Sequence, residues 1–127
     1  MERRVYYHDT DAGGVVYYGN YLKFLEESRT EFLEQRGLSV TSFRDQGHEF
    51  VVRKCTVHYR HPARYGDVVV CEATMKKITS AQIFFNQTLR LKETGRLLVE
   101  AEVVLACIKI PDFKPTQIPE SMKSLLV

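Results

Sequence analysis

The chain has 127 residues, which is enough for one domain with a single core and too few for two. Its 18 basic and 16 acidic residues give a formal charge of +2 and are spread along the sequence, so nucleic acid is a poor candidate partner. No apolar run approaches the roughly 20 residues that cross a bilayer, and residues 1–4 lack the apolar segment of a signal peptide. We therefore expect one domain over residues 1–127, with no membrane span and a cytoplasmic location.

The segment 7–21 is the most informative part of the chain. It places Asp9 and Asp11 before the pair Gly13 and Gly14, just ahead of a predicted helix. Glycine permits positive φ and a close approach of the backbone to a ligand. The unpaired N–H groups at a helix start lie at the positive end of the helix dipole, where they stabilise developing negative charge. The segment therefore predicts an active-site loop in which a carboxylate and an oxyanion site lie together.

One long amphipathic helix follows this loop. Its apolar residues recur at helical spacing, with Lys and Glu residues at the other positions. Asn20 is a suitable N-cap and Gly37 a suitable residue just after the helix, which predicts a helix over about 21–36. The apolar stripe consists of Tyr21, Leu22, Phe24, Leu25, Phe32 and Leu33.

From His48 onward the apolar residues alternate with polar ones, which is typical of half-buried strands. A further short strand is expected near Val5. The connections are short, so they predict antiparallel hairpins without crossover helices. Three prolines in the tail each remove a backbone donor and predict an extended cover without a strand. The four long strands are expected at about 49–60, 69–76, 81–92 and 97–109.

A single helix cannot cover both faces of such a sheet. The face opposite the main apolar set is itself partly apolar, which favours burial against another subunit. A homo-oligomer is therefore expected. The apolar residues of this second face are Phe84, Leu98, Val104, Ala106 and Ile108.

Nine residues in and just before the loop stand at set spacings: Arg4, Val5, Thr10, Asp11, Gly14, Val15, Val16, Tyr18 and Tyr21. They resemble the signature of the 4-hydroxybenzoyl-CoA thioesterase family, and more closely that of its YbgC-type acyl-CoA thioesterases. The resemblance continues through 50–54 and 59–64, so it covers most of the chain. It implies a hotdog fold, an α+β structure in which an antiparallel sheet of about five strands wraps around one long central helix. It also implies dimers with a continuous sheet, which often stack into tetramers.

Thioester hydrolysis is chemistry that such a loop could perform. The unperturbed pKa of a thiol is near ~8.5, so a thiolate leaves without a strong general acid. Asp11 could attack the thioester carbonyl to form an anhydride, or it could activate a water molecule, and the sequence leaves both routes open. In the resembled family the equivalent Asp is catalytic and the backbone N–H at the position of Tyr18 polarises the carbonyl. YbgC-type members commonly carry His at that position, whereas the 4-hydroxybenzoyl-CoA type carries Tyr.

Other interpretations of the loop stay open. Without the resemblance, Asp9 and Asp11 are turn formers whose side chains bond local amides. A hotdog dehydratase would need an acid and base pair that this loop lacks. A non-catalytic acyl-CoA-binding or acyl-sensing domain would keep the pocket and leave Asp11 structural.

The remaining candidate residues concern the substrate, which is expected to be a thioester of coenzyme A or of acyl carrier protein. Tyr7, Gly14 and Val15 are expected to shape the pocket. Basic residues at strand ends could hold the phosphates of coenzyme A, although each could equally be a solvated surface charge. No metal or redox cofactor is expected, and Cys55, Cys71 and Cys107 are expected to be buried free thiols. The basic candidates are Arg60, Arg64, Lys76 and Lys77, with His61 between the first two.

Overall fold

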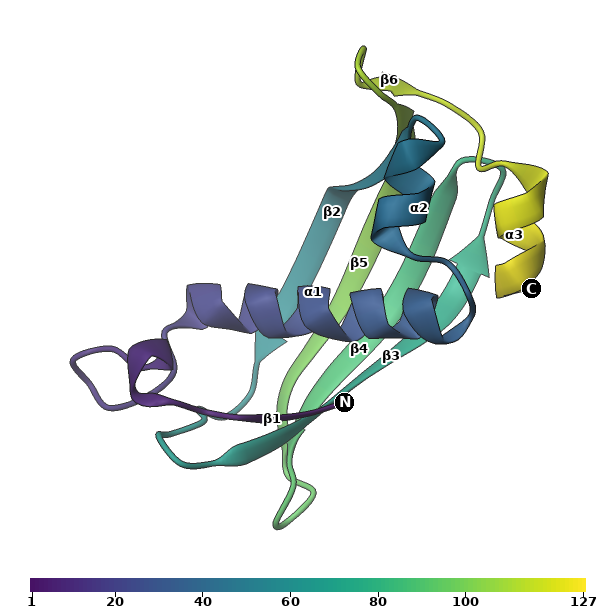
Figure 1. The fold of residues 1–127 in the computed structure, drawn as a ribbon. Helices are drawn as coiled ribbons and strands as arrows, with labels where there is room; N and C mark the ends of the chain where they lie inside the picture. Colours follow the sequence, from purple (N-terminus) through teal and green to yellow (C-terminus); the bar gives the residue numbers. More distant parts are fainter.

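The computed structural model describes residues 1–127 in full. One long helix, α1 (Tyr18–Gln35), lies across one face of a curved antiparallel sheet (Figure 1). The sheet order is β1-β3-β4-β5-β2, with β6 paired to β5. The predicted α+β class, with about five strands around one long helix, is confirmed. The strands are β1 (Glu2–Arg4), β2 (His48–Tyr59), β3 (Val68–Ile78), β4 (Gln82–Leu91), β5 (Leu97–Lys109) and β6 (Lys114–Pro115).

The core lies between α1 and the inner face of the sheet. Phe24 and Leu25 of α1 are fully buried against alternate residues of the central strands, among them Ile83, Phe85 and Leu89 of β4. This alternation is the one expected from the sequence, because successive strand side chains point to opposite faces. The short helix α2 (Val40–Asp45) adds Phe43 to the same core beside the C-terminal half of α1 (Figure 1).

The helix α1 begins three residues earlier than the sequence predicts. Tyr17 takes the N-cap position, and the predicted N-cap Asn20 lies within the first turn. The Asn20 side chain instead donates to the carbonyl of Asp9 at 2.9 Å. The other end is as predicted: Gly37 has φ +86° and follows the helix, and Leu38 donates its N–H to the Leu33 carbonyl at 3.0 Å.

The tail differs from the prediction of an extended cover. It pairs briefly with β5 through β6 and then forms the helix α3 (Glu120–Leu126). Met122 and Leu126 are one helical turn apart and both are buried, so a small apolar face holds this helix on the domain. Pro119 directly precedes α3, where a proline does not interrupt helical hydrogen bonds.

The outer face of the sheet is less exposed than the sequence suggests. Leu98 and Ile108 are already buried within the single chain, so they do not require a second subunit to cover them. Phe84, Val104 and Ala106 are half-buried and remain available on this face.

Two of the three cysteines are buried. Burial raises the pKa of Cys71 to about 12 and that of Cys107 to about 11. Cys55 is exposed on β2, so the prediction of a third buried thiol is wrong. Its side chain lines an open cavity between α1 and β2 beside Leu22 and Arg29, so it is not covered.

None of the helices is both long enough and apolar enough to span a membrane.

Candidate active site

Asp11 lies in a tight turn that closes just before α1. Its N–H donates to the carbonyl of Val15 at 2.9 Å, and the N–H of Gly14 donates back to the carbonyl of Asp11 at 3.0 Å. Gly14 has φ +79°, a region that glycine enters with little strain. Thr10 and Val16 form an antiparallel bridge across the base of the turn. The glycine-containing turn therefore forms as predicted, with Asp11 exposed on it.

Only one oxygen of the Asp11 carboxylate accepts a hydrogen bond within the protein. Its Oδ1 accepts a hydrogen bond from the N–H of Gly13 at 2.8 Å, and its Oδ2 accepts none. A Cβ at Gly13 would lie 3.2 Å from Oδ1, so the glycine permits this close approach. One carboxylate oxygen therefore holds the turn, while the other is free to contact a water molecule or a substrate.

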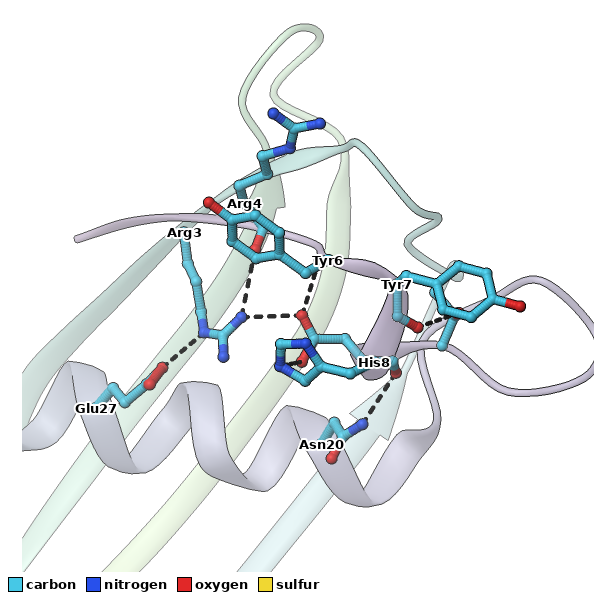
Figure 2. A network of polar contacts seen from close by, with 9 residues as sticks. Arg3, Arg4, Tyr6, Tyr7, His8, Asn20 and Glu27 are labelled. Carbon is cyan, nitrogen blue, oxygen red and sulfur yellow. Dashed lines mark hydrogen bonds and ion pairs between the residues drawn. The ribbon is translucent and has the colours of Figure 1, made fainter.

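Asp9 is the buried anchor of the loop. The residue is 3% exposed, and its Oδ2 accepts hydrogen bonds from the N–H of Tyr6 at 2.9 Å and from Arg3 at 3.1 Å. Arg3 also donates to Glu27 of α1 at 2.8 Å, so it links the loop to the helix (Figure 2). Burial acts to lower the pKa of Arg3, but the hydrogen bond to Glu27 and the two nearby carboxylates outweigh it and raise that pKa. Asp9 thus has the turn-forming role that the sequence left open.

The start of α1 presents free backbone donors beside this loop. The carbonyl of Asp9 accepts the N–H of Tyr17 at 3.0 Å as well as the Asn20 side chain. The N–H groups of Tyr18 and Gly19 donate no hydrogen bond within the protein. Such amides at the positive end of a helix dipole bind anionic or polarised oxygen atoms.

Aromatic side chains form one wall at this end of the helix. The Tyr18 ring packs against Tyr17 at 5.5 Å and against Tyr59 at 5.6 Å between ring centroids. Tyr18 and Tyr59 line a cavity of about 190 Å³ together with Val15 and Arg60. Four predicted residues, Val15, Tyr18, Arg60 and His61, therefore meet at one pocket.

Arg60 and Arg64 lie close to the loop. Arg60 forms an ion pair with Glu100 of β5, and this hydrogen bond holds the pKa of Glu100 below its ordinary value. Arg64 pairs with Val15 in an isolated bridge, and its N–H donates to Asp67 at 2.8 Å. Its side chain is exposed and forms no ion pair. Arg60 thus lines the pocket at Tyr18, and Arg64 lies beside Val15 of the loop.

The other predicted substrate residues are less close. Tyr7 is 81% exposed, with its ring edge-on to Tyr65 at 6.3 Å, and it does not line the pocket at Tyr18. Lys76 and Lys77 lie near the opposite end of β3 from the active-site loop. Lys76 pairs with Glu102 at 3.7 Å on the outer face of the sheet. Within one chain, neither lysine shares the pocket with Arg60 and Arg64.

Sequence reasoning missed two contributors to this site. Tyr59 was not singled out, although an aromatic residue next to Arg60 at a strand end was a usable signal. Arg3 was missed because its partners, Asp9 and Glu27, lie on different elements that only the fold brings together. No local spacing predicts such a contact.

The comparisons with known proteins agree with this fold. The family model described as Thioesterase-like superfamily matches residues 5–126. An acyl-CoA thioester hydrolase YbgC from Escherichia coli O6:H1 is 39% identical over 94% of this chain and 88% of that protein. An acyl-CoA thioesterase YbgC from Haemophilus influenzae is 37% identical over 95% and 88%. The structure of Slr0204, a 1,4-dihydroxy-2-naphthoyl-CoA thioesterase from Synechocystis, is 24% identical with a TM-score of 0.90, over 99% of this chain and 93% of that chain.

An antiparallel sheet wrapped over one long helix defines a hotdog-fold protein. The chain belongs to the Thioesterase-like superfamily. The resemblance to YbgC-type acyl-CoA thioesterases is confirmed.

Proposed function

We propose that this protein hydrolyses acyl-CoA thioesters to a free acid and coenzyme A, with Asp11 and the start of α1 as the reacting site. The observation that carries the proposal is a carboxylate with a free oxygen on a loop that leads directly into two unpaired helix amides. The two YbgC relatives are named for the same activity, which supports the substrate class.

The backbone N–H of Tyr18 would polarise the thioester carbonyl. Negative charge develops on that oxygen when the carbonyl carbon is attacked, and the Tyr18 amide is positioned at the positive end of α1 to receive it. A preorganised donor of this kind typically lowers the barrier by ~3 kcal/mol. Because the donor belongs to the backbone, this step does not depend on the tyrosine side chain.

Asp11 would supply the attack by one of two routes. As a general base it takes a proton from water, whose oxygen bonds to the carbonyl carbon while the tetrahedral intermediate expels the thiolate. As a nucleophile it forms an anhydride with release of the thiolate, and water then hydrolyses the anhydride. Both routes consume one water and give one acid and one thiol. Neither requires a metal or a redox cofactor.

The pantetheine and nucleotide would extend from the pocket past Arg60 and Arg64, with Gly14 and Val15 shaping the entrance. The exposed ring of Tyr7 would contact the ligand only outside the pocket. The Arg64 side chain forms no ion pair and is free to meet a phosphate. Lys76 and Lys77 lie too far along β3 to join them in one chain, so we assign them to coenzyme A only in an assembly in which another copy supplies them.

A homodimer, and a tetramer built from it, is the assembly we propose. β2 is an edge strand of 12 residues with exposed Val52 and Cys55, and a long unpaired edge is a surface along which another strand can add. Light scattering of the purified protein tests this directly, and a monomer at micromolar concentration would contradict it.

The activity is tested by thiol release from short-chain, medium-chain and aromatic acyl-CoA, with acyl carrier protein thioesters as a separate arm. Asp11→Asn should lower kcat by about 10³-fold while the fold is unchanged. Binding of acyl-CoA without thiol release would favour the non-catalytic alternative. A single turnover of a large excess of enzyme in ¹⁸O-labelled water distinguishes the routes, because only the anhydride route can place ¹⁸O in the Asp11 carboxylate.

A further inference from the structure

Arg29 is a buried cation with no carboxylate partner. It lies in the middle of α1 and is 8% exposed. Its one hydrogen bond within the protein goes from Nη1 to the side-chain carbonyl of Gln87 at 3.1 Å. No ion pair within 4.0 Å includes it. A charge removed from water without an opposite charge is costly, so such a residue needs an explanation.

Gln87 holds this guanidinium in one orientation. Its Nε2 donates to the carbonyl of Leu25 at 2.9 Å, which fixes its Oε1 toward Arg29. The Nε and Nη2 atoms of Arg29 donate no hydrogen bond. Neither is sealed off, because His48 Nδ1 is the one fully enclosed side-chain nitrogen or oxygen without a partner. Arg29 therefore presents unused donors to the space beside it.

That space is a groove between α1 and the edge strand β2. A cavity of about 610 Å³ runs from Leu22 and Lys23 to Arg29, with Val52 and Cys55 on the β2 side. A second cavity of about 220 Å³ continues from Arg29 toward Phe43 of α2. Both cavities are lined by Glu26, Arg29 and Val52, so Arg29 stands where they meet.

No carboxylate around the groove forms an ion pair with Arg29 within 4.0 Å. Burial lowers the pKa of Arg29, and the nearby Cys55 and Glu26 only partly oppose this effect. Glu26 is exposed and accepts the hydroxyl of Thr30 at 3.1 Å. Glu27 is already paired with Arg3. The cations Lys23 and Arg29 therefore face two carboxylates without ion pairs, those of Glu26 and Glu49, and neither carboxylate bonds the Arg29 guanidinium.

The groove is aligned with the proposed reaction site. Arg29 follows Tyr18 by three helical turns, a rise of about 16 Å. Helical side chains lean toward the N-terminus, and Arg29 shares its cavity with Leu22 and Lys23 of the second turn. A thioester carbonyl at the Tyr18 amide and a group bound by Arg29 would thus be joined by an acyl chain of medium length.

We propose that Arg29 binds a carboxylate at the far end of the acyl chain, so that the preferred substrates are medium-length acyl-CoA thioesters with a terminal carboxylate. This inference rests on the hydrolase function proposed above. The guanidinium donates Nε–H and Nη2–H to the two carboxylate oxygens, a planar arrangement that suits this pair of groups. Leu22 and Val52 contact the methylene groups between the two ends.

The test compares octanoyl-CoA with its ω-carboxyl analogue, suberyl-CoA. The wild-type protein should show a kcat/KM at least tenfold higher for suberyl-CoA. Arg29→Met should remove this preference, and Arg29→Lys should keep part of it. Arg36→Met is the matched control, because Arg36 caps the same helix, lies over the Phe32 ring and is outside the groove, and it should keep the full preference.

Binding separates the failure of this inference from the failure of the hydrolase proposal. The affinities of Asp11→Asn protein for the two thioesters should differ in the same direction, whether or not the wild type releases thiol. Equal affinities and equal kcat/KM values overturn the role of Arg29 and leave hydrolysis standing. An unchanged preference in folded Arg29→Met also overturns the role of Arg29, whether or not the molecular mass of the variant by light scattering changes. Preferential binding of suberyl-CoA without thiol release would contradict the hydrolase proposal alone.

Discussion

The buried charged side chains beside the two halves of α1 differ in whether they have a partner of opposite charge. At its start, the buried Asp9 is matched by Arg3 and by the Tyr6 amide, and the neighbouring Asp11 is left exposed with one free oxygen. In its second half, the buried Arg29 meets only a neutral amide. A satisfied buried charge is a sign of anchoring, whereas an unsatisfied one indicates a place for a ligand.

The largest expected effect separates the two aspartates of the loop. Asp11→Asn should lower kcat by about 10³-fold and leave the free energy of unfolding unchanged, because the side-chain oxygen of asparagine can still accept the Gly13 N–H. Asp9→Asn should lower the free energy of unfolding by about 2 kcal/mol, since it leaves Arg3 with a single carboxylate partner. Thiol-release kinetics and urea unfolding of both variants measure the pair. Equal losses of stability would mean that the loop has no separate anchor.

Gln87→Leu tests the centre of the helix. It removes a partner from the Leu25 carbonyl and the only partner of Arg29, so the free energy of unfolding should fall by about 2 kcal/mol. Thr88→Val, one residue along the same strand, is the control and should change it by less than about 0.5 kcal/mol. Urea titration checks both variants. If Gln87→Leu leaves the free energy of unfolding unchanged, these two hydrogen bonds contribute nothing to stability.

Gly14→Ala tests the turn that carries Asp11. The positive φ of Gly14 should make alanine destabilising by about 1 kcal/mol, although no atom lies within 4 Å of the added Cβ. Gly14→Asn should recover part of this loss, because asparagine tolerates the left-handed region better. Thermal unfolding compares the three proteins. If alanine and asparagine behave alike, backbone strain is not the cause.

The smallest expected effect is a pH dependence from the buried thiols. Burial raises the pKa of Cys71 to about 12, so the unfolded chain loses this proton first as the pH rises above the ordinary value of 9.0. Stability from this group is therefore complete below pH 9.0 and falls between there and about 12. Between pH 8 and 9.5 the loss should stay below about 1 kcal/mol. Urea titrations should show a flatter decline in Cys71→Ala, and an identical decline would assign the effect elsewhere.

The body of the fold could be predicted from the sequence because it depends on short-range periodicity. The alternation in Gln82–Leu91 and the apolar stripe of α1 are local patterns that survive folding. The start of α1 could not be predicted in this way. Asn20 favours the N-cap position by residue type, but its side chain donates to the Asp9 carbonyl instead. Arg29 could not be predicted either, because its partner Gln87 lies 58 residues away on β4. The candidate pair Asp11 and Tyr18 came from the family signature, whereas composition alone favoured an ordinary turn.

The contact of Gln87 with the Leu25 carbonyl has a consequence for how chain length would be selected. A side chain from a central strand fastens the helix at its midpoint, so α1 cannot slide along the sheet without breaking that hydrogen bond. The distance between the amide of Tyr18 and the guanidinium of Arg29 is then fixed by the number of helical residues between them. Substrates that are one or two carbons too long would have to buckle within the groove, because the helix would not move to accommodate them.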